Sequence, residues 1–207
     1  MNVSMSENSP TDSYKSISKS SIGFYKELGS KFLSFAFPVS SEEEIKNILS
    51  ELRRSYFDAR HHCYAYRLGI NGELWRANDD GEPSFSAGRP ILGQLLSNKI
   101  SDVLVVVVRY FGGIKLGLSG LIQAYKSATI DAINNTEIIE KVACADISFS
   151  FDYLLMNPVM KIIKEFSANI LYQQFDNRCV VKVNIRQSNF SRFSKAIKEA
   201  GGEVITS

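Results

Sequence analysis

The chain has 207 residues, of which 44% are hydrophobic and 11% aromatic, and this content excludes a chain that is disordered throughout. Its formal net charge is only +2, so the whole chain lacks the basic signature of a nucleic-acid-binding protein and any electrostatic surface must be local. The three cysteines are widely spaced and form no CxxC pair, which argues against a disulfide framework and favours a reducing compartment.

The first twelve residues are rich in serine and show no hydrophobic period, so a disordered leader is predicted over residues 1–12. This segment has no apolar core of the kind found in signal peptides. The longest strongly apolar run, residues 103–108, is too short to cross a bilayer. We therefore expect a cytoplasmic protein that makes no membrane contact.

Residues 14–39 alternate apolar and polar positions around Leu28–Gly29–Ser30, which predicts two strands joined by a hairpin. A helix is predicted to begin after Ser41, because Ser41 and Glu44 have the spacing of a capping box. Apolar residues at helical spacing give this helix one buried face, which consists of Ile45, Ile48, Leu49 and Leu52.

A second hairpin is predicted where Asn71–Gly72 separates the alternating runs CYAYRLG and GELWRAND. The stretch DDGEPSFSAGRPILGQLL predicts a loop and then a helix with Pro90 in its first turn. Residues 103–108 are all apolar, as in a central strand that is covered on both faces. A helix follows over residues 121–133, and residues 134–141 are predicted to be a breaker and a charged boundary segment.

The remaining residues, 142–207, have a separate and compact pattern. A strand at CADISFSF is followed by a helix over residues 154–166, a strand edge at residues 169–172, a strand at RCVVKVNIR and a helix over residues 191–200. With a last strand at residues 203–206, this order predicts a small ferredoxin-like α+β module. We therefore expect an α+β protein with domains at residues 13–138 and 142–207.

The connection RYFGGIKLGLSGL, residues 109–121, contains four glycines and two cations but no acid. A strand that leads through glycines into a helix presents free backbone N–H groups and a positive dipole end, which suits a phosphate-like anion. The alternative is that the glycines only permit a tight turn and close packing. The predicted phosphate- or RNA-binding residues are Arg109, Tyr110, Gly112, Gly113, Lys115, Gly117, Gly120 and Lys126.

A second motif is the acidic turn DDGEP, residues 79–83. Asp79, Asp80 and Glu82 offer the oxygen ligands that Mg²⁺ prefers, but the same residues are common in ordinary solvated turns. In a third interpretation these acids orient Arg109, or the N–H groups of the glycine connection, through charge-assisted hydrogen bonds.

The only histidine cluster is His61–His62–Cys63. Zinc would need a second cluster to complete its four ligands, and none is present. His61 and Cys63 share one face of the predicted strand, and we expect a buried, hydrogen-bonded His61 near the acidic turn rather than a Cys–His nucleophilic pair. We thus predict a motif cleft without a metal or a catalytic residue, formed by His61, Cys63, Asp79, Asp80 and Glu82.

Taken in order, DARHHC-A-RLG, DDGEPSFSAG-P-L and VVVVRYFGGIKLGLSGLIQAY resemble the motifs of the IMPACT/YigZ family. The resemblance covers about residues 14–137, and residues 142–207 resemble the short C-terminal domain of bacterial members. It implies a ribosomal protein S-five domain-2-like fold for the first domain and a ferredoxin-like fold, similar to domain V of elongation factors, for the second. Mild departures occur at Arg60, His62 and Ser119.

The favoured function is a non-enzymatic binding protein of the translation machinery, whose partner is RNA, the ribosome or a translation factor, with no cofactor. Glycine amides and cations would hold phosphate, and Tyr110 and Phe111 would add stacking if they face outward. Two alternatives remain open at this point. One is a nucleotide-binding enzyme, because the implied superfold also hosts GHMP small-molecule kinases, and the other is a protein–protein adaptor. The oligomeric state is not predicted.

Overall fold

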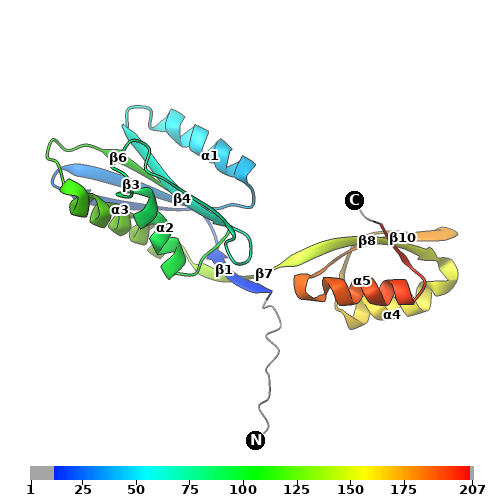
Figure 1. Ribbon diagram of the computed structural model, residues 1–207. Coiled ribbons are helices and arrows are strands. Elements are labelled where there is room, and N and C mark those ends of the chain that lie inside the picture. Colours follow the sequence, from blue (N-terminus) through cyan, green and yellow to red (C-terminus); the bar gives the residue numbers. More distant parts are fainter. Residues whose placement is uncertain (1–11, 206–207) are drawn as a thin grey trace, which may run out of the picture. The chain divides into compact units, whose positions relative to one another are not determined.

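The structure is a computed structural model that describes residues 12–205 (Figure 1). It contains two compact units, and the division falls after Lys141, with Asp12 and Ser13 grouped with the second unit. Residues 1–11, which make up most of the predicted disordered leader, lie outside the described range. Asp12 is described, and its carbonyl oxygen accepts a hydrogen bond of 2.7 Å from the N–H of Ala143. The mixed α and β composition predicted from the sequence is confirmed.

The N-terminal unit is built on a five-stranded antiparallel sheet with the order β2-β3-β6-β4-β5. The strands are β2 (Ser21–Glu27), β3 (Ser30–Pro38), β4 (His61–Leu68), β5 (Leu74–Asn78) and β6 (Val103–Tyr110). Both predicted hairpins are present, one between β2 and β3 and one between β4 and β5. The apolar run is the central strand, as predicted.

Helices cover both faces of this sheet (Figure 1). α1 (Glu42–Ser55) packs on one face, and α2 (Gly88–Ser97) and α3 (Gly117–Asn134) pack on the other. Alternate residues of β6 enter the two cores: Val103, Val105 and Val107 face α2 and α3, whereas Leu104, Val106 and Val108 face α1. This two-sided burial explains why the strand has no polar alternation.

The capping box of α1 differs in one bond from its usual form. The Ser41 hydroxyl accepts the N–H of Glu44 at 3.2 Å, as expected for a helix N-cap. The Glu44 carboxylate, however, accepts the N–H of Ser40 at 2.8 Å instead of that of Ser41. The helix still begins where the sequence predicts.

The segment predicted to be a breaker and a charged boundary is partly a strand. β7 (Ile138–Val142) pairs with β1 (Ser13–Ile17) in a separate two-stranded sheet. The sequence analysis predicted no strand in this charged boundary segment, so β7 is an element that it missed. The five residues IIEKV do not alternate apolar and charged side chains, so they carry only a weak strand signal. Pairing with a segment far away in the sequence supplies the rest.

The C-terminal unit is a four-stranded antiparallel sheet with the order β11-β8-β10-β9. Its strands are β8 (Cys144–Asp152), β9 (Asn169–Gln174), β10 (Arg178–Arg186) and β11 (Glu203–Ile205). α4 (Met156–Glu165) and α5 (Phe190–Glu199) supply the apolar side chains that complete its core. The observed βαββαβ order is the predicted one. Among the described residues, no helix is long and apolar enough to cross a bilayer.

Candidate functional site

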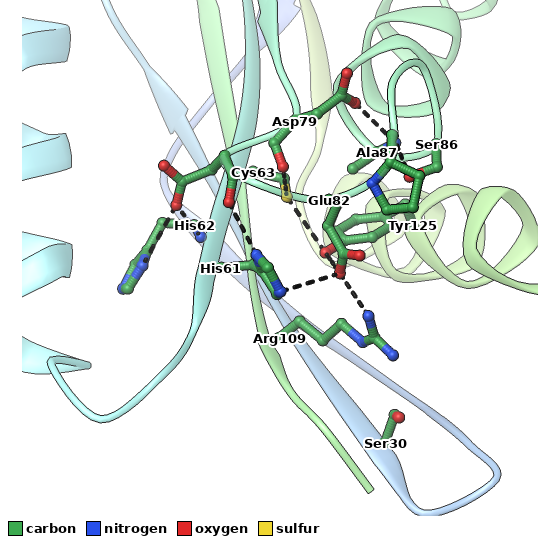
Figure 2. A network of polar contacts seen from close by, with 12 residues as sticks. Ser30, His61, His62, Cys63, Asp79, Glu82, Ser86, Ala87, Arg109 and Tyr125 are labelled. Atoms are coloured by element: carbon green, nitrogen blue, oxygen red, sulfur yellow. Dashed lines mark hydrogen bonds and ion pairs between the residues drawn. The ribbon is translucent and has the colours of Figure 1, made fainter. Parts of the chain in front are cut away.

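The predicted motif residues of the N-terminal unit fall into two groups, a closed polar network and an exposed connection. The network forms where β4, β6, α3 and the acidic turn meet (Figure 2). The register of the sheet places His61 directly opposite Arg109. The acidic turn follows β5 and leads into α2, so its carboxylates reach the same end of the sheet. The fold therefore brings His61 next to Arg109, although the two residues are almost fifty positions apart in the sequence.

Glu82 is the centre of this network. Its buried Oε1 accepts a hydrogen bond of 2.6 Å from Arg109 Nη1 and another of 2.8 Å from the Tyr125 hydroxyl. His61 Nε2 lies 3.9 Å from the same oxygen, and Figure 2 shows the three side chains converging on Glu82. A buried charge is tolerated when it is paired and hydrogen-bonded, so this carboxylate and the Arg109 guanidinium stabilise each other.

The side chains of His61 and Cys63 are held by backbone carbonyls of the acidic turn. His61 Nδ1 lies 2.8 Å from the carbonyl oxygen of Asp80, and Cys63 Sγ lies 3.0 Å from that of Asp79. Cys63 Sγ is also 3.3 Å from the Tyr125 hydroxyl. Burial raises the pKa of both the Cys63 thiol and the Tyr125 phenol. Cys63 is therefore a protonated, inert thiol rather than a nucleophile.

The aspartates of the turn are also engaged with protein groups. Asp79 accepts the N–H groups of Phe85, Ala87 and Gly88 at 2.8–3.0 Å, and so caps the first turn of α2 in place of a conventional N-cap side chain. Asp80 accepts the N–H of His62 at 2.7 Å and pairs with Arg53 at 2.8 Å. The third interpretation of the turn fits these contacts only in part: Glu82 orients Arg109, but the amides that the aspartates hold belong to β4 and the start of α2 and not to the glycine connection.

His62 points to the other side of β4 and is buried. Burial lowers the pKa of its imidazole, and the nearby Asp80 carboxylate opposes that shift. Within residues 12–205, no group of three or more His, Cys, Asp or Glu side chains has metal-binding geometry.

The glycines of the connection between β6 and α3 have different physical roles. Gly112 is held against the β2–β3 turn, since a Cβ built there would lie 1.9 Å from the carbonyl carbon of Gly29. Its N–H donates to the Ser30 hydroxyl at 3.1 Å. Close packing accounts for Gly112, and its amide is already occupied.

Two of the other glycines, Gly113 and Gly117, lie in open space. Gly113 and Gly117 have positive φ values of +90° and +72°, and a Cβ built at either would meet nothing within 4 Å. At Gly120 a Cβ would meet only the Cβ of Leu116, at 3.0 Å. Gly117 and Gly120 lie inside α3, which begins four residues earlier than predicted. Gly113 and Gly117 thus permit a left-handed backbone conformation in open space, whereas Gly120 makes a close contact with Leu116.

The connection carries unpaired backbone donors. The N–H groups of Gly113, Ile114 and Lys115 have no acceptor among the described residues. α3 begins without a capping side chain and without an acid in its first turn, so its positive dipole end is uncompensated. Lys115 is exposed beside it.

Three of the residues predicted to bind phosphate or RNA do not join this exposed group. Arg109 belongs to the buried network, where its charge is paired with Glu82. Tyr110 is half-buried and donates to Asp58 at 2.8 Å, and burial together with this carboxylate raises the pKa of its phenol to about 12. Lys126 lies more than two turns into α3, about 14 Å along the axis from its first residue.

The structure also shows a groove that the sequence analysis missed. It has a volume of about 500 Å³ and lies next to the connection. Its lining residues come from the β2–β3 hairpin and the end of β6: Phe24, Gly29, Lys31, Leu33, Tyr110 and Phe111. Lys26 lies directly opposite Lys31 in the antiparallel pair. Alternation within β2 and β3 predicts which side chains share a face, but only the pairing with β6 brings them to the glycine connection.

The part of the chain that contains this site also matches a known protein family. Residues 28–133 match the Impact N-terminal domain family, and this range contains all three motifs. The chain is 31% identical to the IMPACT family member YvyE of Bacillus subtilis over 82% of this chain and 78% of that protein. It belongs to the IMPACT family. The predicted family is therefore confirmed.

Bacterial IMPACT members also match the C-terminal unit. The member YigZ of Escherichia coli is 26% identical over 82% of this chain and 84% of its own length. A crystal structure described as that of a hypothetical protein has a TM-score of 0.70, with 24% identity, 94% of this chain covered and 97% of that chain. This likeness shows that the same fold occurs in a protein whose structure was determined by crystallography.

The burial of the three cysteines of this IMPACT member predicts how their thiols react. Cys63 and Cys179 are buried and Cys144 is exposed, so an aromatic disulfide reagent should modify one thiol of the native protein and all three in denaturant. The measurement is the absorbance of the released thiolate. A C144S/C179S variant, in which Cys63 is the remaining cysteine, should release no rapid equivalent. Rapid release of one equivalent would show that Cys63 is a reactive thiol and would reopen the nucleophile interpretation.

Proposed function

We propose that this IMPACT family member is a binding protein associated with translation rather than an enzyme, and that its partner is RNA. The RNA contacts the surface where β6 ends and α3 begins. We call it the β6–α3 surface and define it by Phe24, Lys26, Lys31, Phe111, Gly113, Lys115 and Gly117. The observation that carries the proposal is that unpaired amides, unpaired cations and exposed aromatics adjoin here.

The first support is a place for a phosphate group. Free N–H groups at Gly113–Lys115, the uncapped start of α3 and the exposed Lys115 all favour negative oxygen. No aspartate or glutamate occurs from Val103 to Ile130, so nothing on this stretch of chain opposes an anion. Gly113 and Gly117 leave room for close approach of a ligand.

The second support is a pair of lysines beside the groove: Lys31 lines it, and Lys26 lies opposite Lys31 in the adjacent strand. Lys26 and Lys31 face each other across β2 and β3, and like charges in this position destabilise a sheet. Neither lysine forms an ion pair within residues 12–205. Folding alone gives no reason for this arrangement, whereas a phosphate backbone would neutralise both charges.

The third support is the position of the aromatic side chains. Phe24 and Phe111 line the groove and are about half exposed, at 49% and 53%. Unstacked bases bind to such faces with little sequence preference. A single-stranded or loop region of RNA therefore fits this surface better than a regular duplex.

The open face of the C-terminal sheet is less suited to RNA. Its central strands lack aromatic residues at the middle positions, where Ser148 is paired with Lys182. Lys182 is itself paired with Asp146 at 2.9 Å, and Arg178 is paired with Glu203. Charges that are already paired contribute little to the capture of phosphate, so we assign the binding to the N-terminal unit.

The alternative of a nucleotide-binding enzyme receives less support from the site. A Mg²⁺-dependent kinase would need free carboxylates, but Asp79 caps α2, Asp80 binds Arg53 and Glu82 binds Arg109. The buried thiol of Cys63 is protonated and does not supply a nucleophile. Calorimetric titration with Mg-ATP tests this alternative directly, and heat of binding at millimolar nucleotide would favour it.

We also propose the finer fold assignments that the family resemblance implies. The N-terminal unit would be a ribosomal protein S-five domain-2-like fold, and the C-terminal unit would be ferredoxin-like, as in domain V of elongation factors. The strand order β11-β8-β10-β9 around two helices supports the second assignment.

RNA binding by the full chain is expected to fall steeply with salt. If Lys26, Lys31 and Lys115 each contact a phosphate, affinity should drop roughly 20-fold between 50 and 200 mM KCl. The measurement is the fluorescence anisotropy of a labelled RNA hairpin with a single-stranded loop. A double K26A/K31A variant should bind about tenfold more weakly and show a smaller salt dependence.

The matched control removes two lysines from the C-terminal unit. K161A/K164A removes the same number of positive charges, here from the exposed surface of α4, and should leave RNA affinity unchanged. Affinity that is insensitive to salt, or equal loss in both double variants, would contradict the proposed surface. Association with ribosomal particles that survives nuclease treatment would favour the protein–protein adaptor instead.

A further inference from the structure

A second groove lies on the N-terminal unit, between the edge strand β5 and helix α2. It has a volume of about 380 Å³ and consists mainly of apolar side chains. Its lining residues are Trp75, Arg89, Leu92, Gly93 and Leu96. None of them belongs to the buried network or to the β6–α3 surface.

The strand beside this groove has one unpaired side. β5 is the last strand of the sheet and pairs only with β4, so its outer backbone N–H and C=O groups are free to bind another strand. Large apolar side chains are exposed along it: Trp75 is 57% exposed, and Leu96 across the groove is 52% exposed. Exposed edges with such side chains are usually protected, and this one is not.

Gly93 gives an independent indication that something approaches the groove. It lies within α2, at a position where its φ is not in the left-handed region, and a Cβ built there would meet nothing within 4 Å. The fold of this chain therefore does not require glycine at this position, although glycine weakens a helix relative to alanine. A small residue in the wall of the groove leaves space for close contact with a partner.

The groove is lined by one charged side chain, an arginine. The guanidinium of Arg89 lies 4.3 Å from the centre of the Phe85 ring. Arg76 is exposed on β5 next to Trp75 and points to the other face of the strand. Neither arginine forms an ion pair among the described residues. α2 contains no acid. A partner that complements this surface carries carboxylates next to apolar side chains.

We propose that β5 and this groove bind an extended segment of a partner protein, in which apolar side chains alternate with acidic ones. The segment adds to the free edge of β5 as a further strand. Because successive side chains of a strand point to opposite faces, its apolar residues enter the groove beside Trp75 and Gly93. Its acidic residues contact Arg76 on the other face, and a terminal carboxylate side chain reaches Arg89. When a strand is added to a sheet edge, the backbone hydrogen bonds between the strands supply affinity, and the groove selects the side chains of the bound segment.

Trp75 is the only tryptophan of the chain, so its fluorescence reports on the groove in the full-length protein. The probe is the peptide Ac-ELEVELE-NH₂, with Ac-KLKVKLK-NH₂ as the charge control. We expect the acidic peptide to shift the emission of Trp75 to shorter wavelength with saturation. The basic peptide, and an acidic peptide N-methylated at alternate residues, should bind at least about tenfold more weakly.

Two variants separate binding from folding. G93L fills the groove while favouring the helix, so it should keep or raise the melting temperature and weaken peptide binding about tenfold. R89E should weaken it to a similar extent, whereas the matched reversal K46E on α1 should have no effect. Equal binding of both peptides, or full binding by G93L, would overturn the proposal. A Trp75 shift that depends on protein concentration without peptide would overturn it in favour of a second copy of this chain.

Discussion

Replacing Glu82 with alanine is expected to lower the free energy of unfolding of the N-terminal unit by about 3–5 kcal/mol. The variant leaves the buried Arg109 guanidinium without its carboxylate, whose oxygen lies 2.6 Å away in the native protein. Arg109 Nε already has no hydrogen-bond partner among the described groups, so little remains to compensate the buried charge. Urea unfolding followed by the fluorescence of Trp75 measures the change in this unit alone.

The double variant E82L/R109M provides the control. Removing both members of a buried pair leaves apolar side chains of similar volume, so most of the lost stability should return. Y125F removes a hydroxyl that donates to the Glu82 carboxylate and contacts Cys63 Sγ, but it leaves the ion pair intact and should cost about 1–3 kcal/mol. If E82A costs less than about 1 kcal/mol, the pair is more solvated than the structure indicates and the network is not closed.

The network has a second consequence, because Arg109 connects it to the β6–α3 surface. Its guanidinium carbon lies 5.5 Å from the centre of the Phe32 ring and 5.7 Å from that of Phe111. Glu82 fixes the guanidinium, and the guanidinium in turn supports Phe111 at the entrance of the glycine connection. The role of Glu82 is thus positional: it holds Arg109, which lies beside Phe111, a residue that we propose to contact RNA.

Local signals in the sequence were sufficient for most of the fold. Asn71–Gly72 marked the hairpin between β4 and β5, although the connection is the longer loop 69–73, in which Gly72 but not Asn71 has a positive φ. The unbroken apolar run 103–108 marked the buried central strand. β7 was not predicted, because its partner strand β1 lies more than a hundred residues away in the sequence. No local pattern of five residues reports such a distant partner.

The candidate site was predictable where chemistry constrains the side chain. A histidine beside a strand full of apolar residues needs a polar partner, and His61 indeed lies by the acidic turn. Tyr125 lies in the helix predicted over residues 121–133, but nothing in its spacing indicates that its hydroxyl bridges Cys63 and Glu82. The opposition of Lys26 and Lys31 depends on strand register, which a hairpin turn determines only once its geometry is known.

Substituting Gly112 with alanine is expected to cost about 3 kcal/mol of unfolding free energy, whereas the same change at Gly113 should cost about 1–2 kcal/mol. At Gly112 the new Cβ overlaps the backbone of Gly29 and Ser30, at 1.9 and 2.1 Å, and backbone atoms in a tight turn have little freedom to move. At Gly113 space is open, and only the left-handed φ of +90° opposes a side chain. Urea unfolding of both variants measures the difference.

G113N provides the matched control, since asparagine tolerates the left-handed region better than alanine and should recover part of the loss. This series separates the two explanations of the glycine connection that the sequence leaves open. A large cost at Gly112 and a small one at Gly113 assign the first glycine to packing and leave the second available for a ligand. If G112A is as stable as the native protein, the β2–β3 turn yields easily, and close packing no longer explains why a glycine stands there.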